Sequence, residues 1–466
     1  MRPSTPPLPK AGIPSLPALR HALVQRLTTE QAPLLRSLLD GLGSPLHLML
    51  PQVFEANARA FQQTLREAGV DGQLLFAKKA NKARCLVERC PGLGLGVDAA
   101  SVPELVAALA AGVPGAHIGI SGPAKHPALL ALSLHHDCLV AMDSPEELLD
   151  YAALAQSLQR RARVLLRWRP PSQPRSRFGM DDTELAQALA LCVEHRAQLQ
   201  LQGFSFHLSG YDAVERARCA QRLVERCTEA RGLGLPCDTL DIGGGFAVRY
   251  VEEAAWQDFI ARQSPQDYHA GKTFEGFYPY ASASPGPQML ERILSHAEGG
   301  RTLARRLREE GLRLLLEPGR ALLDQAGFTL FRVQGVKDRP AEGYGLVTVE
   351  GMSFSLSEQW FNSEFLPDPL LLGGSASGPY PAAVAGASCL DSDMLSWRKL
   401  PLPSRPKPGD ALVYLNTAGY QMDSNESPFH ELPLPRKVSL EVDANSGLRW
   451  RLDEVPPVTP PLPLSL

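Results

Sequence analysis

Between residues 74 and 320, short apolar runs alternate with longer stretches of helical period. Amphipathic segments such as residues 146–160, 182–196 and 214–231 separate runs short enough to be buried strands. The eight runs are LLFAKK, LGLGVD, AHIGISG, DCLVAMD, RVLLRW, LQGFSFH, DTLDIGGG and LRLLLEPGR. Parallel strands that are buried on both faces are continuously apolar, as these are. The pattern therefore predicts an α/β fold, a (β/α)8 TIM barrel, with an open doubly wound sheet as the alternative.

After about residue 325 the helical period fades, and the apolar runs become FTLFRVQGV, YGLVTVEG, DALVYLN, KVSLEV and LRWRL. This change predicts a second, mostly β, C-terminal domain, to which SPLHLML near residue 47 would add a strand. We expect three parts. A Pro-rich N-terminal tail and a segment packing on the β domain occupy residues 1–43, the barrel 44–325, and the β-rich domain with its Pro-rich tail 326–466.

The connection between Gly245 and Glu317 is long, and residues 251–300 form an insertion of unclear role. Its aromatic-rich part, residues 256–280, has little period. Long insertions at the carboxyl end of a barrel are often lids, and a plain surface excursion is an equal alternative.

Polar residues occur where the apolar runs end. They are Lys79, Asp98, Asp143, Arg167, His207, the glycines 243 to 245 and Glu317. Any single one would be an ordinary loop residue, but barrel enzymes build their sites at the carboxyl ends of different strands. The convergence favours the barrel and a site on this rim.

The composition points to a small-molecule partner. With 47 basic and 50 acidic residues, the formal charge of -3 gives no broad attraction to nucleic acid or to an anionic membrane. The Pro-broken N-terminus lacks the apolar core of a signal peptide, so we expect a soluble, cytoplasmic protein. The eight cysteines lack paired CxxC spacing, which argues against a metal site and a disulfide framework.

Three rim features suggest pyridoxal 5'-phosphate as cofactor. A lysine at the end of a buried strand, Lys78 or Lys79, would lose hydration, which lowers its pKa and favours the neutral amine that forms a Schiff base. The glycines of DIGGGF would let backbone N–H groups cradle a phosphate. In EPGR, Glu317 would pair with a protonated ring nitrogen and Arg320 with an anion.

A family resemblance is carried by many short motifs in order: FAKKAN, VDAASVPE, SRFGM, FSFHLSG, LDIGGGF, EPGR, GASCLDSDML and NTAGY…SPFHELPLPRKV. From about residue 45 to 437 the chain resembles the pyridoxal-phosphate-dependent ornithine/diaminopimelate/arginine decarboxylases of the alanine-racemase-like fold (fold type III). The resemblance implies a homodimer with active sites completed across the interface. It also implies decarboxylation of an amino acid or amino-acid conjugate through a Lys79 Schiff base and a quinonoid intermediate.

The resemblance also implies roles for individual residues. The catalytic residues would be Lys79, Glu317, His207 stacked on the cofactor ring, and Cys389 returning a proton to the α-carbon from the partner subunit. The cofactor-binding residues would be Lys79, Asp98, His207, Ser209, Gly243, Gly244, Gly245, Glu317, Gly319, Arg320 and Tyr420. Asp98 and Glu104 would orient their neighbours near the lysine.

The chain departs from the family pattern at several positions. In FHLSG the phosphate-binding serine is shifted, and Ser209 would replace it; His430 stands where asparagine is common. Leu390 and Asn362 occupy positions that are acidic in relatives acting on diamino acids. A buried ammonium without a carboxylate is costly, which makes ornithine or lysine doubtful as the substrate. The substrate-binding candidates are Asn362, Glu364, Asp391 and Asp393.

Two other functions remain open. A racemase or epimerase on the same fold would remove a proton instead of carboxylate from the α-carbon. A non-catalytic relative would bind the cofactor or a protein partner without turnover. The identity and stereochemistry of the substrate are not readable from the residues.

Overall fold

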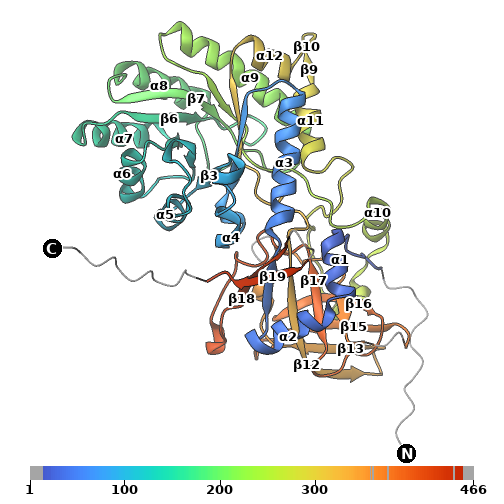
Figure 1. Cartoon of the computed structure of the whole chain (residues 1–466). Coiled ribbons are helices and arrows are strands. Elements are labelled where there is room, and N and C mark those ends of the chain that lie inside the picture. Colours follow the sequence, from blue (N-terminus) through green and yellow to red (C-terminus); the bar gives the residue numbers. More distant parts are fainter. Residues whose placement is uncertain (1–13, 357, 359–361, 375–376, 444–446, 455–466) are drawn as a thin grey trace, which may run out of the picture.

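Residues 72–316 contain the strands of a closed barrel in the computed structural model, and a large β-sheet lies beside it (Figure 1). The structure describes residues 14–356, 358, 362–374, 377–443 and 447–454. The parallel strands close in the order β11-β2-β3-β4-β5-β6-β7-β8. They are β2 (Gly72–Ala77), β3 (Gly96–Ala99), β4 (Ile118–Ile120), β5 (Leu139–Met142), β6 (Ala162–Arg167), β7 (Leu199–Ser205), β8 (Thr239–Asp241) and β11 (Arg313–Leu316). Each predicted run supplies one strand, so the (β/α)8 barrel is confirmed and the open sheet is excluded.

Helices cover the outside of the barrel, and several begin at a side chain that caps their first turn. Ser101 and Ser144 each accept a backbone N–H three residues later, and Asp181 forms a capping box with Glu184. The helices are α3 (Pro51–Glu67), α4 (Arg84–Val87), α5 (Val102–Ala110), α6 (Pro127–His135), α7 (Pro145–Ser157), α8 (Asp182–Glu194), α9 (Ala213–Gly232), α11 (Pro287–Ser295) and α12 (Leu303–Glu309). The three amphipathic segments expected from the sequence are α7, α8 and α9.

Side chains from alternate positions fill the interior of the barrel. Leu75, Leu139, Leu165 and Leu315, from four different strands, form one buried cluster there. Because side chains alternate along a strand, the inward position of Leu75 also directs Ala77 inward. The register of β2 thus determines which residues after the end of the strand point toward the barrel axis.

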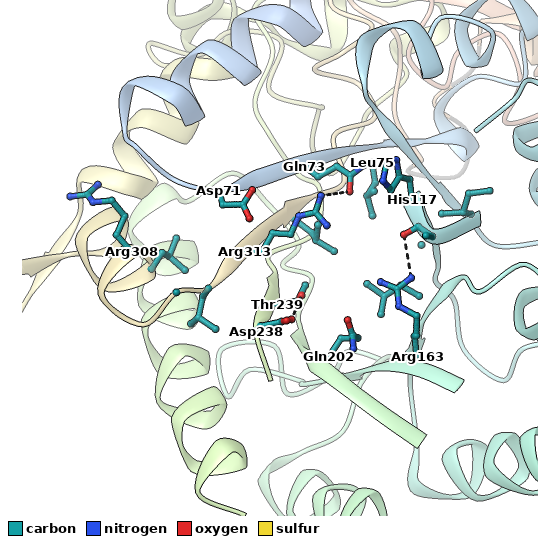
Figure 2. A pocket seen from close by; sticks show the side chains of 18 of the residues that line it. Asp71, Gln73, Leu75, His117, Arg163, Gln202, Asp238, Thr239, Arg308 and Arg313 are labelled. Carbon is teal, nitrogen blue, oxygen red and sulfur yellow. Dashed lines mark hydrogen bonds between the residues drawn. The ribbon is translucent and has the colours of Figure 1, made fainter. Parts of the chain in front are cut away.

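A cavity of about 420 Å³ lies at the amino ends of the barrel strands (Figure 2). Gln73 of β2, Arg163 of β6 and Arg313 of β11 lie along its wall. Arg313 donates to Gln73 Oε1 at 2.9 Å, and Arg163 donates to the carbonyl oxygen of Ala116 at 3.3 Å. This end of the barrel is polar, but it is the end opposite the rim residues singled out above.

The second part is a nine-stranded sheet, which confirms the expected mostly β C-terminal region. Its strands are β1 (Leu46–Met49), β12 (Gly327–Arg339), β13 (Tyr344–Val349), β14 (Leu370–Leu372), β15 (Tyr380–Ala385), β16 (Met394–Leu402), β17 (Ala411–Leu415), β18 (Arg436–Val442) and β19 (Leu448–Leu452). The main path runs β16-β15-β13-β12-β1-β18-β19, with β17 pairing β12 and β14. β1, the strand expected near residue 47, lies antiparallel to β12 and parallel to β18.

The long connection between β8 and β11 packs against the second sheet. It contains α10 (Glu253–Arg262), the hairpin β9 (Ala297–Glu298) and β10 (Arg301–Thr302), and several turns. Trp256, Phe259 and Tyr280 are buried in an aromatic cluster, and His269 Nδ1 lies 2.7 Å from the hydroxyl of Tyr344 on β13. This segment is a packed part of the fold and not a loose surface excursion.

Helices α1 (Ala22–Thr29) and α2 (Ala32–Leu42) precede β1. Short 3-10 turns complete the structure: η1 (Lys78–Ala80), η2 (Pro91–Leu93), η3 (Gly115–His117), η4 (Pro265–Asp267), η5 (His269–Gly271), η6 (Ser353–Ser355) and η8 (Phe429–Glu431). Within the described residues, no helix is both long enough and apolar enough to cross a bilayer.

Candidate active site

A cavity of about 490 Å³ opens at the carboxyl ends of the barrel strands. Most of the residues that the sequence analysis assigned to the cofactor lie together in its wall: Lys79, His207, Ser209, Gly244, Gly245, Glu317, Gly319, Arg320 and Tyr420. Aromatic side chains of Tyr211, Phe246, Phe277 and Tyr278 form another part of the wall. Phe277 and Tyr278 come from the long connection, so part of the aromatic-rich segment does reach the site.

Lys79, and not Lys78, faces this cavity. Lys79 Nζ donates to Asp98 Oδ2 at 2.7 Å, and the lysine side chain is 43% exposed because it lines the cavity. Lys78 is 3% exposed, and its Nζ donates to the carbonyl oxygen of Lys82 at 2.8 Å. The inward direction set at Leu75 is retained at Lys79 after β2 passes into η1. The register that the sequence left open is therefore resolved.

The charge of Lys79 differs from the expectation. Surrounding protein disfavours the ammonium, but the carboxylates of Asp98 and then Glu317 outweigh this burial and raise the pKa of Lys79 above its usual value. The expected lowering of this pKa is wrong for the chain without its cofactor. The physical reason is the ion pair with Asp98, which the sequence placed on the rim but not next to the ammonium.

Asp98, Asp241 and Glu317 form a buried cluster of carboxyl groups beside Lys79. Burial raises the pKa of Glu317 well above its usual value, and the charges of Asp241 and Asp98 raise it further. Burial also raises the pKa of Asp241 to about 7, although the N–H of Gly243 donates to its Oδ1 at 2.8 Å. Among the described residues, Asp98 Oδ1 has no hydrogen-bond partner. The cluster can accept a further cationic or N–H group.

The glycine turn after β8 leaves no space for side chains. A Cβ on Gly243 would lie 2.8 Å from His207 Nδ1, and one on Gly244 would lie 2.5 Å from the carbonyl oxygen of Glu317. Gly243 and Gly245 also have φ of 68° and 77°, in the left-handed region. The three glycines therefore bring backbone directly to the cavity wall.

Arg216 of α9 supports this turn from behind and was missed by the sequence analysis. Its side chain is fully buried, and Nη1 donates to the carbonyl oxygen of Ile242 at 2.8 Å. Nη2 donates to the carbonyl oxygens of Gly245 at 3.4 Å and Gly210 at 3.5 Å. Within the part of the chain that is described, it forms no ion pair. A buried arginine in an arginine-rich helix has no distinguishing sequence signal.

His207 follows β7 and exposes its ring to the cavity. Desolvation by the surrounding protein lowers its pKa to about 3, and the charges of Lys79 and Arg216 act in the same direction. The imidazole is therefore neutral at ordinary pH. A neutral ring at this position can lie against a flat aromatic group without charge repulsion.

Arg320 lies between two aromatic rings. Its guanidinium carbon lies 4.2 Å from the ring centroid of Tyr278 and 4.9 Å from that of Tyr420. Nη1 donates to Gln421 Oε1 at 3.1 Å and lies 3.8 Å from Glu358 Oε1. Glu358, also buried, was not singled out from the sequence because it lies in an irregular loop.

Asp143 and Arg167, two of the residues at strand ends, contact the neighbouring loop that contains Phe178 and Gly179 and hold it in place. Asp143 Oδ1 accepts from Arg167 Nη1 at 3.3 Å and from the N–H of Gly179 at 3.1 Å. The Arg167 guanidinium lies 4.6 Å from the ring of Phe178. Neither rim residue is in the cavity wall.

Glu364 and Asn362 also lie outside the cavity wall. The Glu364 carboxylate accepts backbone N–H groups from Trp397 at 2.7 Å and Arg398 at 3.2 Å. Burial raises the pKa of Glu364 to about 7, although the charge of Arg398 opposes this. Asn362 is exposed, with φ of 45°. The structure therefore brings neither candidate to Lys79 within one subunit.

The loop carrying Cys389 lies apart from this cavity as well. Cys389 is exposed, and its Sγ lies 3.2 Å from His430 Nε2. Asp391 is exposed, whereas Asp393 is buried and accepts the N–H groups of Ser353 at 2.7 Å and Ser388 at 3.1 Å. Asp393 thus shapes the loop.

Residues 52–275 match the family described as pyridoxal-dependent decarboxylase, pyridoxal binding domain. The chain is also 38% identical over 438 residues to the uncharacterized protein y4yA of Sinorhizobium fredii, an alignment covering 93% of this chain and 95% of that protein. The chain belongs to the pyridoxal-dependent decarboxylase family. This makes it a carboxy-lyase with pyridoxal 5'-phosphate as its cofactor.

Other relatives of this pyridoxal-dependent decarboxylase extend the likeness over both parts of the chain. A diaminopimelate decarboxylase of Bacillus methanolicus is 26% identical over 419 residues, covering 86% of this chain and 88% of that enzyme. The crystal structure of the diaminopimelate decarboxylase from M. jannaschii with L-lysine has a TM-score of 0.72 and 18% identity, and the match covers 90% and 91% of the two chains. The structural likeness shows that the fold is shared.

The cavity fits the cofactor of this pyridoxal-dependent decarboxylase family. An added cation such as a protonated ring nitrogen would relieve the mutual repulsion that raises the pKa values in the carboxyl cluster, and the lysine amine lies beside this cluster. The backbone of Gly244 and Gly245 lies in the cavity wall, next to Arg216, and can receive a phosphate. Opposite charges are thus available for the opposite ends of the cofactor.

Proposed function

We propose that this chain decarboxylates an amino acid or an amino-acid conjugate, with Lys79 as the residue that carries the cofactor. The observation that carries the proposal is the lysine amine, 2.7 Å from Asp98, in a cavity whose wall also contains His207, Glu317 and Arg320. When bound, pyridoxal 5'-phosphate supplies an electron sink for the pair left on the α-carbon as carbon dioxide departs. The protein residues hold the groups and move the protons.

The residues act at the two ends of the cofactor. Lys79 provides the amine for covalent attachment, and Asp98 orients that amine. Glu317 holds the proton of the ring nitrogen, and neutral His207 covers one face of the ring. The phosphate is held by a group of residues made of Ser209, Gly243, Gly244, Gly245, Gly319, Arg320 and Tyr420, with Arg216 behind the glycine turn.

Cys389 returns a proton to the α-carbon from a second copy of the chain. This proposal is supported by the position of Cys389 on an exposed loop, outside the cavity wall of its own subunit. Leu390 beside it and Phe429 beside His430 are 49% and 41% exposed, which gives the loop an apolar surface suited to a subunit contact. The active unit is accordingly a homodimer.

The substrate side chain meets a wall that is aromatic on this subunit. Of the described residues that line the cavity, Glu317 is the one with a carboxyl group, and we assign it to the ring nitrogen. Glu364 and Asn362 lie outside the cavity, so a distal ammonium would depend on exposed Asp391 of a second copy. A substrate without a distal ammonium is the better fit. A soluble, cytoplasmic location stays a prediction from the sequence.

Trapping the lysine tests the attachment. Purified protein loaded with cofactor is treated with borohydride and digested, and the pyridoxyl-labelled peptide is identified by mass spectrometry. We expect the label on Lys79 and its loss in Lys79→Ala, while Lys78→Ala keeps it because the Lys78 amine bonds to Lys82. A label on any other lysine, or none, overturns the proposal.

Product analysis tests the reaction. Amino acids and their conjugates are screened for release of carbon dioxide and for the matching amine. Inversion of the α-carbon without carbon dioxide identifies a racemase or epimerase. A yellow protein that changes no substrate identifies a non-catalytic relative.

A further inference from the structure

Cys389 has a histidine partner whose role the cofactor chemistry leaves unassigned. Its Sγ lies 3.2 Å from His430 Nε2, and its backbone N–H also points to this nitrogen, at 3.4 Å. We propose that His430 is a positioning residue that shares the Cys389 proton and sets the protonation state of the thiol. This inference rests on the proposed function for its catalytic meaning, but the pair can be tested without turnover.

The loop of Cys389 is built to hold the thiol in one place. The N–H of Gly386 donates to the carbonyl oxygen of Asp393 at 2.8 Å, and the N–H of Asp393 donates to the carbonyl oxygen of Leu390 at 3.0 Å. A Cβ on Gly386 would lie 2.2 Å from Asp393 Oδ2. The thiol is therefore presented on a closed loop, directed at the ring of His430.

The hydrogen bonds indicate the direction in which the proton is held. A backbone N–H can only donate, so the ring nitrogen that faces Cys389 N is an acceptor. The same nitrogen can then accept the thiol proton. A thiol and an imidazole nitrogen 3.2 Å apart can therefore share one proton through this contact.

The pair completes a proton path to the substrate. The S–H bond of Cys389 breaks as its proton joins the electron pair left on the α-carbon by departing carbon dioxide, which leaves a thiolate. The thiolate regains its proton from water through His430, whose neutral Nε2 first accepts a proton from water and then donates it to the sulfur. One proton from solvent thus replaces each carbon dioxide released.

Other charged groups on the two loops are partly engaged elsewhere. Asp393 accepts two backbone N–H groups, and Glu426 pairs with Lys82. Asp391 beside the thiol and Glu431 beside the imidazole are exposed. Both carboxyl groups are unchanged in the variants below.

The rate of alkylation of Cys389 tests the contact between Cys389 and His430 directly. The other seven cysteines are buried, so iodoacetamide applied to the folded, full-length protein should label Cys389 first. The rate of labelling at Cys389 is followed by peptide mass spectrometry from about pH 6 to about pH 9.5, because only the thiolate reacts.

The matched variant is His430→Asn. His430 has φ of 58°, a conformation that asparagine tolerates well, so the backbone can remain while the basic nitrogen is lost. We expect labelling near neutral pH to slow several-fold, because the nitrogen that accepts the thiol proton is lost, and the rates to converge at high pH, where the thiol is ionised without a base. His195→Asn, at the half-buried C-terminal cap of α8, far from Cys389 in the chain, should leave the profile unchanged.

An unchanged labelling profile in His430→Asn and in His430→Gln would overturn the inference. A variant that unfolds is recognised because its buried cysteines become reactive and labelling rises at every pH. This outcome would also count against the role assigned to His430. Lys79→Ala should keep the wild-type profile while losing the borohydride label. If wild-type Lys79 takes no label but the profile still shifts in His430→Asn, the proposed function fails and the pair stands.

Discussion

The ammonium of Lys79 is stabilised by the carboxylate that orients it. Asp98 Oδ2 lies 2.7 Å from Nζ, and this contact together with the charge of Glu317 outweighs burial in setting the pKa of the lysine. Only the neutral amine can attack an aldehyde. In the role proposed for Lys79, the ion pair would position the amine and would also slow its reaction with free cofactor.

Asp98→Asn should lower the pKa of Lys79, because desolvation then acts without the opposing charge. Each unit of lowering gives about tenfold more neutral amine near pH 7. The pH profile of cofactor uptake, followed by absorbance, should move to lower pH. Asp143→Asn is the control, since Asp143 pairs with Arg167 and Gly179 instead; an unshifted profile in Asp98→Asn would count against the ion pair.

Glu364 behaves in the structure as a fold residue and not as a substrate ligand. Its folded pKa of about 7 lies above the ordinary value of 4.5, so the folded state binds more protons between these pH values and stability falls as pH rises. Glu364→Gln should flatten the dependence of unfolding free energy on pH in this window. The slope should change by at most about 1.4 kcal/mol per pH unit, one proton. Chemical denaturation at several pH values measures it, and an unchanged slope contradicts the assignment.

At the scale of single residues, the sequence pattern predicts the site residues that stand at strand ends. It does not predict those whose place in the site depends on burial and on neighbours from other elements. Lys79, His207 and Glu317 could be predicted because they end apolar runs. Asp241 lies within such a run, where a carboxyl group has no periodic signal, and Arg216 lies among exposed arginines of α9. Burial and neighbouring charge, which only the folded chain defines, distinguish these two.

Among the elements, the turn after β8 has little steric freedom. Gly244 has ordinary φ, so its constraint is purely steric: a Cβ would meet the carbonyl oxygen of Glu317 at 2.5 Å. Since both groups belong to backbone, relief requires a strand end to move. The turn and the end of β11 are thus coupled, and any shift changes both the phosphate end and the ring-nitrogen end of the cavity.

Gly244→Ala should weaken cofactor binding while the fold is retained. Overpacking of this kind costs about 1–3 kcal/mol, which corresponds to roughly ten- to a hundredfold in affinity. Gly276→Ala is the matched control, because Gly276 lines the same cavity and a Cβ added there would have no neighbouring atom within 4 Å. Fluorescence titration with pyridoxal 5'-phosphate compares them; equal affinities would show that the turn adapts freely.

The elements were the most predictable level of this molecule. All eight barrel strands could be predicted from continuous apolar runs, because a strand that is buried on both faces has apolar residues at successive positions. The connection at residues 256–280 could not, since its aromatic residues pack against β13 and β16 through contacts distant in sequence. The loops of Asn362 and Cys389 likewise depend on backbone partners elsewhere and carry no period.

For the whole molecule, the separation of Lys79 from Cys389 makes the assembly testable. Lys79→Ala and Cys389→Ala subunits each lack one half of a shared site. If a site takes its lysine from one subunit and its cysteine from the other, a mixed dimer contains one intact site and one doubly altered site.

Mixing equal amounts of the two inactive variants under exchange conditions should therefore restore activity. Random pairing makes about half of the dimers mixed, each with one intact site, so about one quarter of wild-type activity is expected. Decarboxylation of a substrate identified by the screen provides the measurement. No recovery after confirmed subunit exchange would argue that each subunit completes its own site.

The position of β1 affects how related chains can be recombined. This strand precedes the barrel in the chain yet lies between β12 and β18, inside the sheet formed mainly after residue 326. A chimera with a single junction after β11 would leave the recipient's own strand in the middle of a donor sheet. Exchanging the whole sheet requires two junctions, one before and one after the barrel in the sequence, so that β1 comes from the same parent as β12 and β18.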